Sequence, residues 1–262
     1  MLRSVFAKTL WDQRRSIVAW ALGIAAVAAM YSSFYPSARQ RSAETVASLP
    51  PALRQAFGFG QIASPAGYPE ATVFNFIVPL LLIGFVSTLG ARAIAGDEEA
   101  GTIDLLLAHP IGRVPLVLHR VAALAVATAV SGGALLLGLL AIAGPAQLDI
   151  PAGNFAAMTL HLVVLGLCFG TVALAIGAAT GRRAAALAAT AAVAVLGYFA
   201  NTLAPQQPTT AWLQRLSPFA YCAGASPLEH GVHVGDVAVL VIASVVLVGA
   251  GALVFSRRDV TV

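Results

Sequence analysis

The acidic residues are the side chains of this sequence best placed to do chemistry, and four of its 11 carboxylates lie within residues 96–115. That stretch reads GDEEAGTIDLLLAHPIGRVP. Paired carboxylates can act as general acid and base, whereas adjacent acids at the start of a helix stabilise its positive end. Because the second arrangement is the commoner one, we expect Glu98 and Glu99 to be electrostatic anchors and expect no catalytic residue here.

The histidines and cysteines form no pattern that indicates a metal site, a cofactor site or a nucleophile. Cys168 lies within an apolar segment and Cys222 in a predicted loop, so we expect no disulfide between them. His161 lies in an apolar segment near Asn154, which indicates a hydrogen-bonded core histidine or one near the outer interface; a functional intramembrane group is the alternative. The other histidines have no ligand-like spacing to acids or thiols: His109, His119, His230 and His233.

The acidic stretch also carries the signals of a short amphipathic helix. Gly96 breaks the preceding helix, Asp97 can cap a new one, and Pro110 stops it. Gly101 inside this helix costs about 1 kcal/mol relative to Ala. One face is apolar by its helical spacing, and it comprises Ala100, Ile103, Leu106 and Leu107. We therefore predict a surface helix over residues 97–110.

The composition indicates an integral membrane protein. Of the 262 residues, 59% are hydrophobic and 10% charged, whereas soluble domains carry about 25% charged residues. The mean hydropathy is +0.85. The net charge of +4 is spread over short loops, so we expect no nucleic-acid partner. The lipid bilayer is the expected surrounding.

Six apolar segments are long enough to cross a bilayer, which takes about 20 residues. We expect an all-α fold with one transmembrane domain over residues 1–262, in which Pro79 kinks the second span. Residues 1–16 are basic and amphipathic, which indicates an interfacial helix; the basic flank of the first span and a cleaved signal peptide are alternatives. The predicted spans cover about 17–34, 72–95, 116–143, 155–180, 184–203 and 237–255.

The distribution of Lys and Arg predicts the orientation. With the N-terminus inside, eleven of the 15 basic residues lie on the inner side and four on the outer side. Short cytoplasmic loops carry the excess of Lys and Arg. We therefore expect both termini and the 97–110 helix to be cytoplasmic.

Two spans carry faces of small residues, which let helix backbones approach closely. On the fourth span these are Gly166, Gly170, Ala173, Gly177 and Gly181. On the third span they are Ala127, Ser131, Ala134 and Gly138. We expect these two faces to pack on each other within the subunit; a seam between two subunits is the alternative.

The acidic stretch also carries a family pattern, Glu98-Glu99-x-Gly101-Thr102-x-Asp104-x-Leu106-Leu107 followed by Pro110 and Arg113. It resembles the cytoplasmic loop of permease subunits in the type-2 ABC exporter family, with Asp104 in place of the commoner Glu. Other segments resemble the family too, so the likeness covers nearly the whole chain: residues 50–58, 74–79, 217–219 and 257–259.

The resemblance implies an ATP-driven exporter subunit in a prokaryotic plasma membrane. The implied residues that couple to the ATPase are Asp97, Glu98, Glu99, Gly101, Thr102, Ile103, Asp104, Leu106, Leu107, Pro110 and Arg113. Glu98, Glu99 and Asp104 would face basic groups. The apolar side chains of Ile103, Leu106 and Leu107 would enter a groove of the partner.

The implied partners are a separate cytoplasmic ATPase and a second permease, either identical or related. The sequence has no G-x-x-x-x-G-K-[ST] phosphate loop and its only lysine is Lys8, so ATP and Mg²⁺ would bind the ATPase. The spans hold almost no ionisable groups, which favours an apolar or amphipathic cargo and counts against the first alternative, an ATP-independent carrier or channel. The second alternative, a membrane enzyme, lacks a convincing set of catalytic residues in the sequence.

Overall fold

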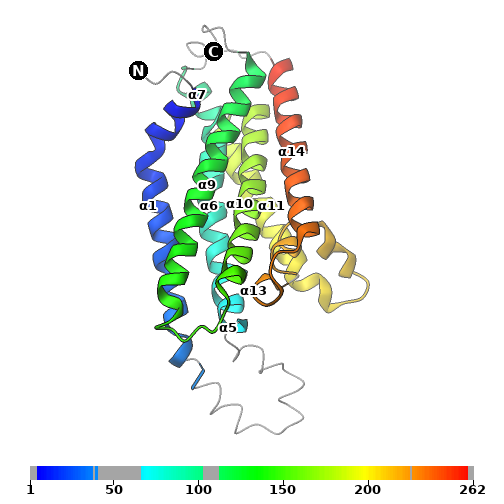
Figure 1. The fold of residues 1–262 in the computed structure, drawn as a ribbon. Coiled ribbons are helices and arrows are strands. Elements are labelled where there is room, and N and C mark those ends of the chain that lie inside the picture. The colour runs from blue at the N-terminus through cyan, green and yellow to red at the C-terminus, as the bar shows by residue number, and fades with distance from the viewer. Residues whose placement is uncertain (1–4, 38, 41–65, 103–111, 225, 259–262) are drawn as a thin grey trace.

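The computed structural model describes residues 5–37, 39–40, 66–102, 112–224 and 226–258, and the regular structure of these residues is entirely helical. Six helices are long and apolar enough to cross a membrane (Figure 1). The prediction of an all-α fold with six spans is confirmed. Five of the spans contain one long helix each: α1 (Val5–Ser33), α9 (Arg113–Ala143), α10 (Ala152–Thr180), α11 (Arg183–Leu203) and α14 (Val234–Arg257). The second span, Gly67–Arg92, ends in α6 (Val78–Arg92) and starts with two shorter helical elements.

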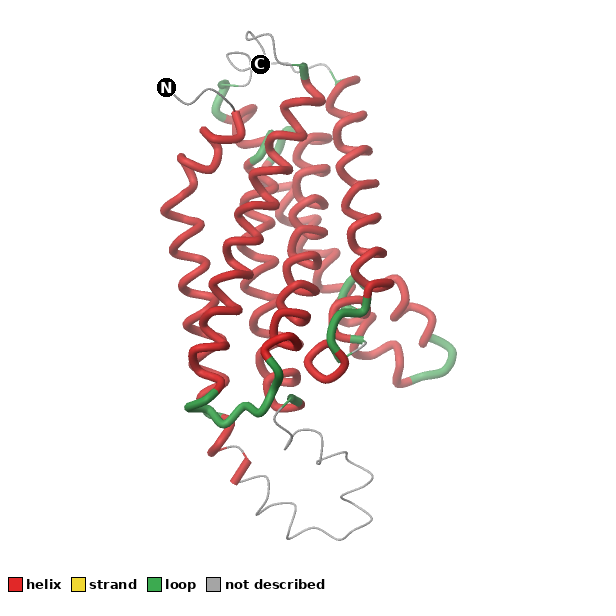
Figure 2. The backbone as a smooth tube through the Cα atoms, in the orientation of Figure 1, coloured by secondary structure: helices red, strands yellow, loops and turns green. Residues whose placement is uncertain are grey.

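Shorter elements lie at the two ends of this bundle (Figure 2). The helix α7 (Ala95–Glu99) lies at the same end as the start of α1 and the end of α14, and we call this the α7 end. The opposite end, called the α13 end, holds the remaining short elements. These are α5 (Gly67–Pro69), η2 (Ala204–Gln206), η3 (Ala211–Leu216), α12 (Ala220–Ala223) and α13 (Pro227–His230).

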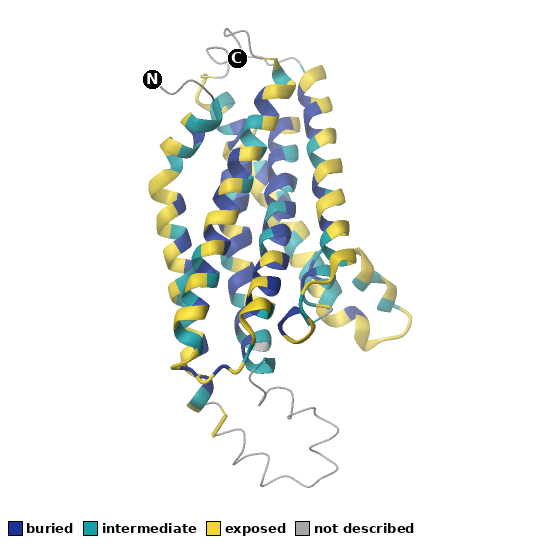
Figure 3. Ribbon diagram, viewed as in Figure 1, coloured by how far each residue is buried: buried dark blue, intermediate teal, exposed yellow. Residues whose placement is uncertain are grey.

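The helices α6 and α10 form the centre of the bundle. Of their most apolar stretches, 61% and 67% of the residues are buried, against 17% for α11 and 22% for α14 (Figure 3). The outer helices expose large apolar side chains such as Leu196 and Val245. Because lipid tails are as apolar as leucine, this pattern suits helices that face a bilayer or another subunit.

Glycines set the closest approach between the central helices. A Cβ added to Gly90 of α6 would lie 2.2 Å from the carbonyl oxygen of Gly170 on α10. Gly166 faces Leu82 of α6, and Gly170 also faces Leu124 of α9. The small-residue face of α10 therefore packs on α6 as well as on α9.

The predicted packing partner of the third-span face is wrong for part of that face. Gly138 of α9 faces Ala25 of α1, where an added Cβ would lie 3.2 Å from the alanine Cβ. Gly132 of α9 faces α10, where an added Cβ would lie 2.2 Å from the Val163 side chain. A helix wedged between α1 and α10 presents small residues to both, and spacing along one helix cannot show which neighbour each residue meets.

The N-terminal segment differs from the predicted interfacial helix over residues 1–16. The helix α1 runs without a break from Val5 to Ser33, so the basic stretch continues directly into the first span. No glycine or proline lies between residues 5 and 22 to end a helix there. Arg14 stacks over the ring of Trp11 at 4.0 Å from its centroid.

The second span contains a π-helix, η1 (Glu70–Ile77), which follows α5 and ends two residues before Pro79. The amide of Val78 donates to the carbonyl of Val73, five residues back. A proline ring clashes with the carbonyl four residues before it, and a π-turn widens the backbone at such a point. The second span therefore meets Pro79 with a widened turn.

Candidate functional site

The acidic stretch forms a shorter helix than predicted. The helix α7 has Ile94 at its N-cap, so Gly96 and Asp97 lie inside it, and the predicted cap at Asp97 is wrong. It ends at Glu99, and Gly101 follows with φ of +64°. Glycine adopts this left-handed conformation without strain, which suits the end of a helix. The prediction that the helix continues through Gly101 is therefore wrong.

Thr102 closes this turn. Its amide and its hydroxyl both donate to the carbonyl oxygen of Asp97, at 2.9 and 3.1 Å. The remaining predicted coupling residues of the stretch lie outside the described residues, namely Ile103, Asp104, Leu106, Leu107 and Pro110.

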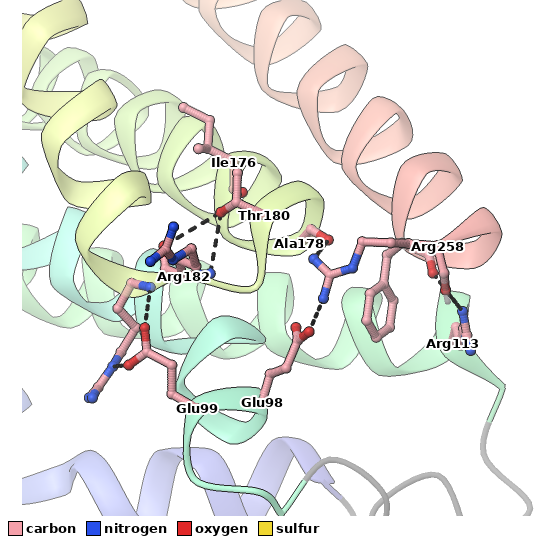
Figure 4. Close-up of polar contacts among 10 residues, drawn as sticks. Glu98, Glu99, Arg113, Ile176, Ala178, Thr180, Arg182 and Arg258 are labelled. Atoms are coloured by element: carbon pink, nitrogen blue, oxygen red, sulfur yellow. Dashed lines mark hydrogen bonds and ion pairs between the residues drawn. The ribbon is translucent and has the colours of Figure 1, made fainter. Parts of the chain in front are cut away.

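The three acids of α7 each bind an arginine from a different part of the bundle. Asp97 pairs with Arg120 of α9. Glu98 pairs with Arg258, which directly follows α14 (Figure 4). Glu99 accepts from both the side-chain Nε and the backbone amide of Arg183, at 2.5 and 2.7 Å, at the start of α11.

These pairs join α7 to further helices. Arg120 also donates from Nη1 to the hydroxyl of Thr9 on α1, at 2.8 Å. Arg258 also donates from Nη1 to the carbonyl of Ala178 on α10, at 3.1 Å. A five-residue helix is thus connected to α1, α9, α10, α11 and the end of α14.

Asp97 and Glu99 of α7 differ in their surroundings. Burial raises the pKa of Asp97 above its ordinary value and outweighs the attraction of Arg120. The hydrogen bonds from Arg183 lower the pKa of Glu99, whose carboxylate is solvated. Glu99 is therefore held in its charged form, whereas Asp97 is charged at some cost in desolvation.

Glu98 lies against the C-terminal end of α10. Gly181 ends that helix with φ of +68°, and its amide donates to the carbonyl of Gly177 at 2.8 Å. A Cβ added to Gly181 would lie 2.6 Å from the Glu98 carboxylate. Gly181 therefore provides a left-handed cap and space for an acid, a role that the predicted helix-packing face does not describe.

Arg113, another predicted coupling residue, binds the end of α14. Its Nη1 donates to the carbonyls of Phe255 at 2.9 Å and Arg258 at 2.5 Å (Figure 4). Its guanidinium lies 5.6 Å from the ring centroid of Phe255, which is fully buried. The last carbonyls of a helix have no partner within it and carry partial negative charge, so this arginine caps α14.

Sequence reasoning missed the basic partners Arg120, Arg183 and Arg258 as site residues and used them only to count charges. Their positions in the sequence could have pointed to them, because each lies within two turns of a helix end on the side that carries α7. That signal does not assign a particular arginine to a particular acid, because the assignment depends on how the helices pack.

At the α13 end, the prediction of a hydrogen-bonded core histidine is confirmed. His161 is fully buried; its Nδ1 lies 3.1 Å from the carbonyl of Tyr221, and its Nε2 lies 3.3 Å from the amide of His233. An amide only donates, so Nε2 accepts and Nδ1 carries the proton. Asn154 donates to the carbonyl of Leu228 at 2.8 Å. Cys168 and Cys222 are free thiols.

Comparison with known proteins places these features in a family. The profile of the ABC-2 family transporter proteins matches residues 3–260. The probable ABC transporter permease protein NosY of Pseudomonas aeruginosa is 31% identical over 116 residues, which cover 43% of this chain and 41% of that protein. The match thus spans less than half of that relative's length. The chain belongs to the ABC-2 family of transporter proteins and is a multi-pass protein of a prokaryotic plasma membrane.

Proposed function

We propose that this chain is the permease subunit of an ATP-driven exporter and that the α7 end is its contact with a separate ATPase. The observation that carries the proposal is the convergence of connections on α7. Asp97, Glu98 and Glu99 are tied by ion pairs to α9, the end of α14 and α11. A push on this short helix would therefore reach several spans at once.

In this proposal the energy comes from another polypeptide. The sequence has no phosphate loop for ATP, so ATP and Mg²⁺ would bind to the ATPase subunits. ATP binding would close two ATPases below two permeases, either two copies of this chain or this chain and a relative. The basic start of α1 and the 97–110 stretch would pass that motion to the spans. The path for the cargo would then switch from inward- to outward-facing.

The charge distribution supports a cytoplasmic α7 end. Most of the chain's Lys and Arg residues lie on that side, as expected for cytoplasmic loops. ATP is available on the same side. The acids of α7 face arginines of this chain, and Asp104 lies outside the described residues.

The buried polar groups favour an apolar or amphipathic cargo over an ion-coupled carrier. Among the described residues, the fully buried polar side chains are hydroxyls and His161, and none is Asp, Glu, Lys or Arg. Carriers that couple to ions or protons need such charges along their pathway. An ATP-independent carrier or channel is therefore the weaker candidate.

The test of the ATPase partner is purification of the tagged chain from its native membranes in mild detergent, followed by mass spectrometry. We expect a stoichiometric soluble protein with a phosphate-loop motif. Recovery of this chain alone, across several detergents and with ATP analogues present, would favour the carrier or channel.

The test of the coupling assignment is Leu106→Asp. We expect permease-stimulated ATPase activity to fall while the variant still inserts, because a charge replaces a predicted apolar contact with the partner. The matched control is Leu216→Asp at the α13 end, where the leucine side chain is 70% exposed. Normal stimulation by well-folded Leu106→Asp protein would contradict the assignment.

A further inference from the structure

Arg258 occupies a junction between three helices at the α7 end. Its Nη2 pairs with Oε1 of Glu98 on α7, and its Nη1 donates to the carbonyl of Ala178 in the last turn of α10 at 3.1 Å. Its backbone directly continues α14. The guanidinium of Arg258 thus joins the end of α14 to α7 and α10 (Figure 4).

The backbone that carries Arg258 is itself fixed. Arg113, at the start of α9, donates to the carbonyls of Phe255 and Arg258, at 2.9 and 2.5 Å. The Phe255 side chain is fully buried among the helices that surround it. The end of α14 therefore cannot move independently of α9, and the Arg258 side chain projects from a held position.

The position of Glu98 depends on this arginine. The side chains of Glu98 and Arg258 are only 16% and 20% exposed. Oε2 of Glu98 is buried and has no hydrogen-bond partner among the described residues. The carboxylate also lies beside the C-terminal end of α10, which carries partial negative charge. Without Arg258, a buried charge would be left unpaired next to a repulsive helix end.

We propose that Arg258 is a positioning residue of the coupling site. Through it, the end of α14 moves together with α7. This inference rests on the proposed function, because it assigns a role within the same site. A displacement of α7 moves Glu98, and through Arg258 it moves α14 and the end of α10 together. Asp97 and Glu99 connect α7 to α9 and α11 in parallel.

The first experiment measures the link in the isolated permease. Spin labels at Ala100→Cys and Leu253→Cys, both exposed positions, report the distance between the end of α7 and α14 in lipid nanodiscs. The native cysteines Cys168 and Cys222 are buried, at 4% and 2% exposure, which limits background labelling. We expect one narrow distance distribution, which Arg258→Gln broadens.

The control is Arg257→Gln, the adjacent arginine, whose side chain is exposed. We expect it to leave the distribution narrow. An unchanged distribution in Arg258→Gln would overturn the proposal that this residue holds α7 to α14.

The second experiment measures coupling in the assembled transporter. We expect Arg258→Gln to reduce permease-stimulated ATPase activity by roughly five- to tenfold, at the lower end of the range for coupling between two sites. Arg258→Gln should also lower the Tm, because it leaves the Glu98 charge unpaired. The double variant Glu98→Gln/Arg258→Gln removes that charge, so its Tm should return toward the wild-type value. Its stimulated activity should stay low, because the connection is still missing.

The results separate this inference from the proposed function. Recovery of stimulation together with Tm in the double variant would show a merely structural role and overturn the inference. Normal stimulation by folded Arg258→Gln would do the same. An assembled wild-type complex with no stimulated activity would instead overturn the proposed function.

Discussion

The two ends of the bundle are held together by different chemistry. At the α7 end, charged side chains meet across helices in three ion pairs, Asp97–Arg120, Glu98–Arg258 and Glu99–Arg183. At the α13 end, most contacts between elements are made by neutral side chains to backbone groups. These contacts include Asn154 with Leu228, His161 with Tyr221, and Ser217 with the carbonyl of Gly197 at 2.7 Å. The acids there make local or weaker contacts: Asp236 pairs with His233 within one turn at 3.0 Å, and Glu70 accepts from the hydroxyl of Ser226 at 3.3 Å.

This difference suits two different tasks. A neutral hydrogen bond to a buried carbonyl is insensitive to salt and fixes a loop in one place, so the α13 end is suited to hold the loops between α11 and α14. Ion pairs near a surface weaken as ionic strength rises, and they can exchange partners. The α7 end is therefore suited to respond to another protein or to a change in its ionic surroundings.

The largest expected effect is at the α13 end, in His161→Leu. This change removes the imidazole that bonds to the carbonyl of Tyr221 and the amide of His233, and a polar group left without a partner away from water costs about 1–3 kcal/mol. We expect a loss of stability of about 2–4 kcal/mol that does not depend on salt. Thermal unfolding in detergent at low and high NaCl measures it. His230→Leu, at an exposed position, is the control and should change Tm little.

A strong dependence of the His161→Leu effect on NaCl would contradict the comparison, because it would mean that charge also holds the α13 end.

An intermediate effect is expected at the α7 end in Gly181→Ala. The alanine would adopt φ of +68°, and its Cβ would lie 2.6 Å from the Glu98 carboxylate. Left-handed backbone in a residue other than glycine costs about 1–3 kcal/mol, and displacement of Glu98 disturbs its pair with Arg258. We expect a Tm decrease together with lower ATPase stimulation.

Gly249→Ala is the matched control for Gly181→Ala. An added Cβ there meets nothing within 4 Å, and alanine is favoured over glycine within a helix by about 1 kcal/mol. Equal stability of Gly181→Ala and Gly249→Ala proteins would show that the cap and the space for Glu98 are unimportant.

The smallest expected effect concerns the solvated pair of Glu99 and Arg183. Their coupling is measured by the Tm values of the two single Gln variants and the double variant. Arg183 lowers the folded-state pKa of Glu99 below its ordinary value of 4.5. The pair therefore stabilises the fold above the unfolded-state pKa, and this contribution is lost as pH falls through the folded-state pKa.

We also expect this coupling to shrink between about 0.1 and 1 M NaCl, as screening shortens from about 10 to 3 Å. A coupling that persisted at high salt and low pH would place Glu99 with the neutral contacts of the α13 end and break the comparison.

Much of the fold follows from the sequence, because burial in a bilayer requires long apolar runs. The six spans are visible as such runs, and their predicted bounds differ from the observed helices by a few residues except for the first span. The acid-rich stretch after the second span also follows from composition, since four carboxylates cannot lie within a span. His161 was assigned as a hydrogen-bonded core residue because a single histidine in an apolar run needs partners.

Other features required the tertiary structure. Whether α1 breaks near residue 16 depends on which surfaces flank it, and Val5 to Ser33 form one helix. Gly101 was expected within a helix but ends one, because a glycine is compatible with both states and the surrounding contacts choose.

The sequence alone determined which segments are long and apolar enough to cross a membrane, where the charges gather and which family the chain belongs to. These properties depend on local composition and on motifs at fixed spacing. Only the tertiary structure decided that Arg120, Arg183 and Arg258 are the partners of Asp97, Glu99 and Glu98. An ion pair between residues up to 160 positions apart is set by how helices pack, and the periodicity of a single helix carries no information about its neighbours.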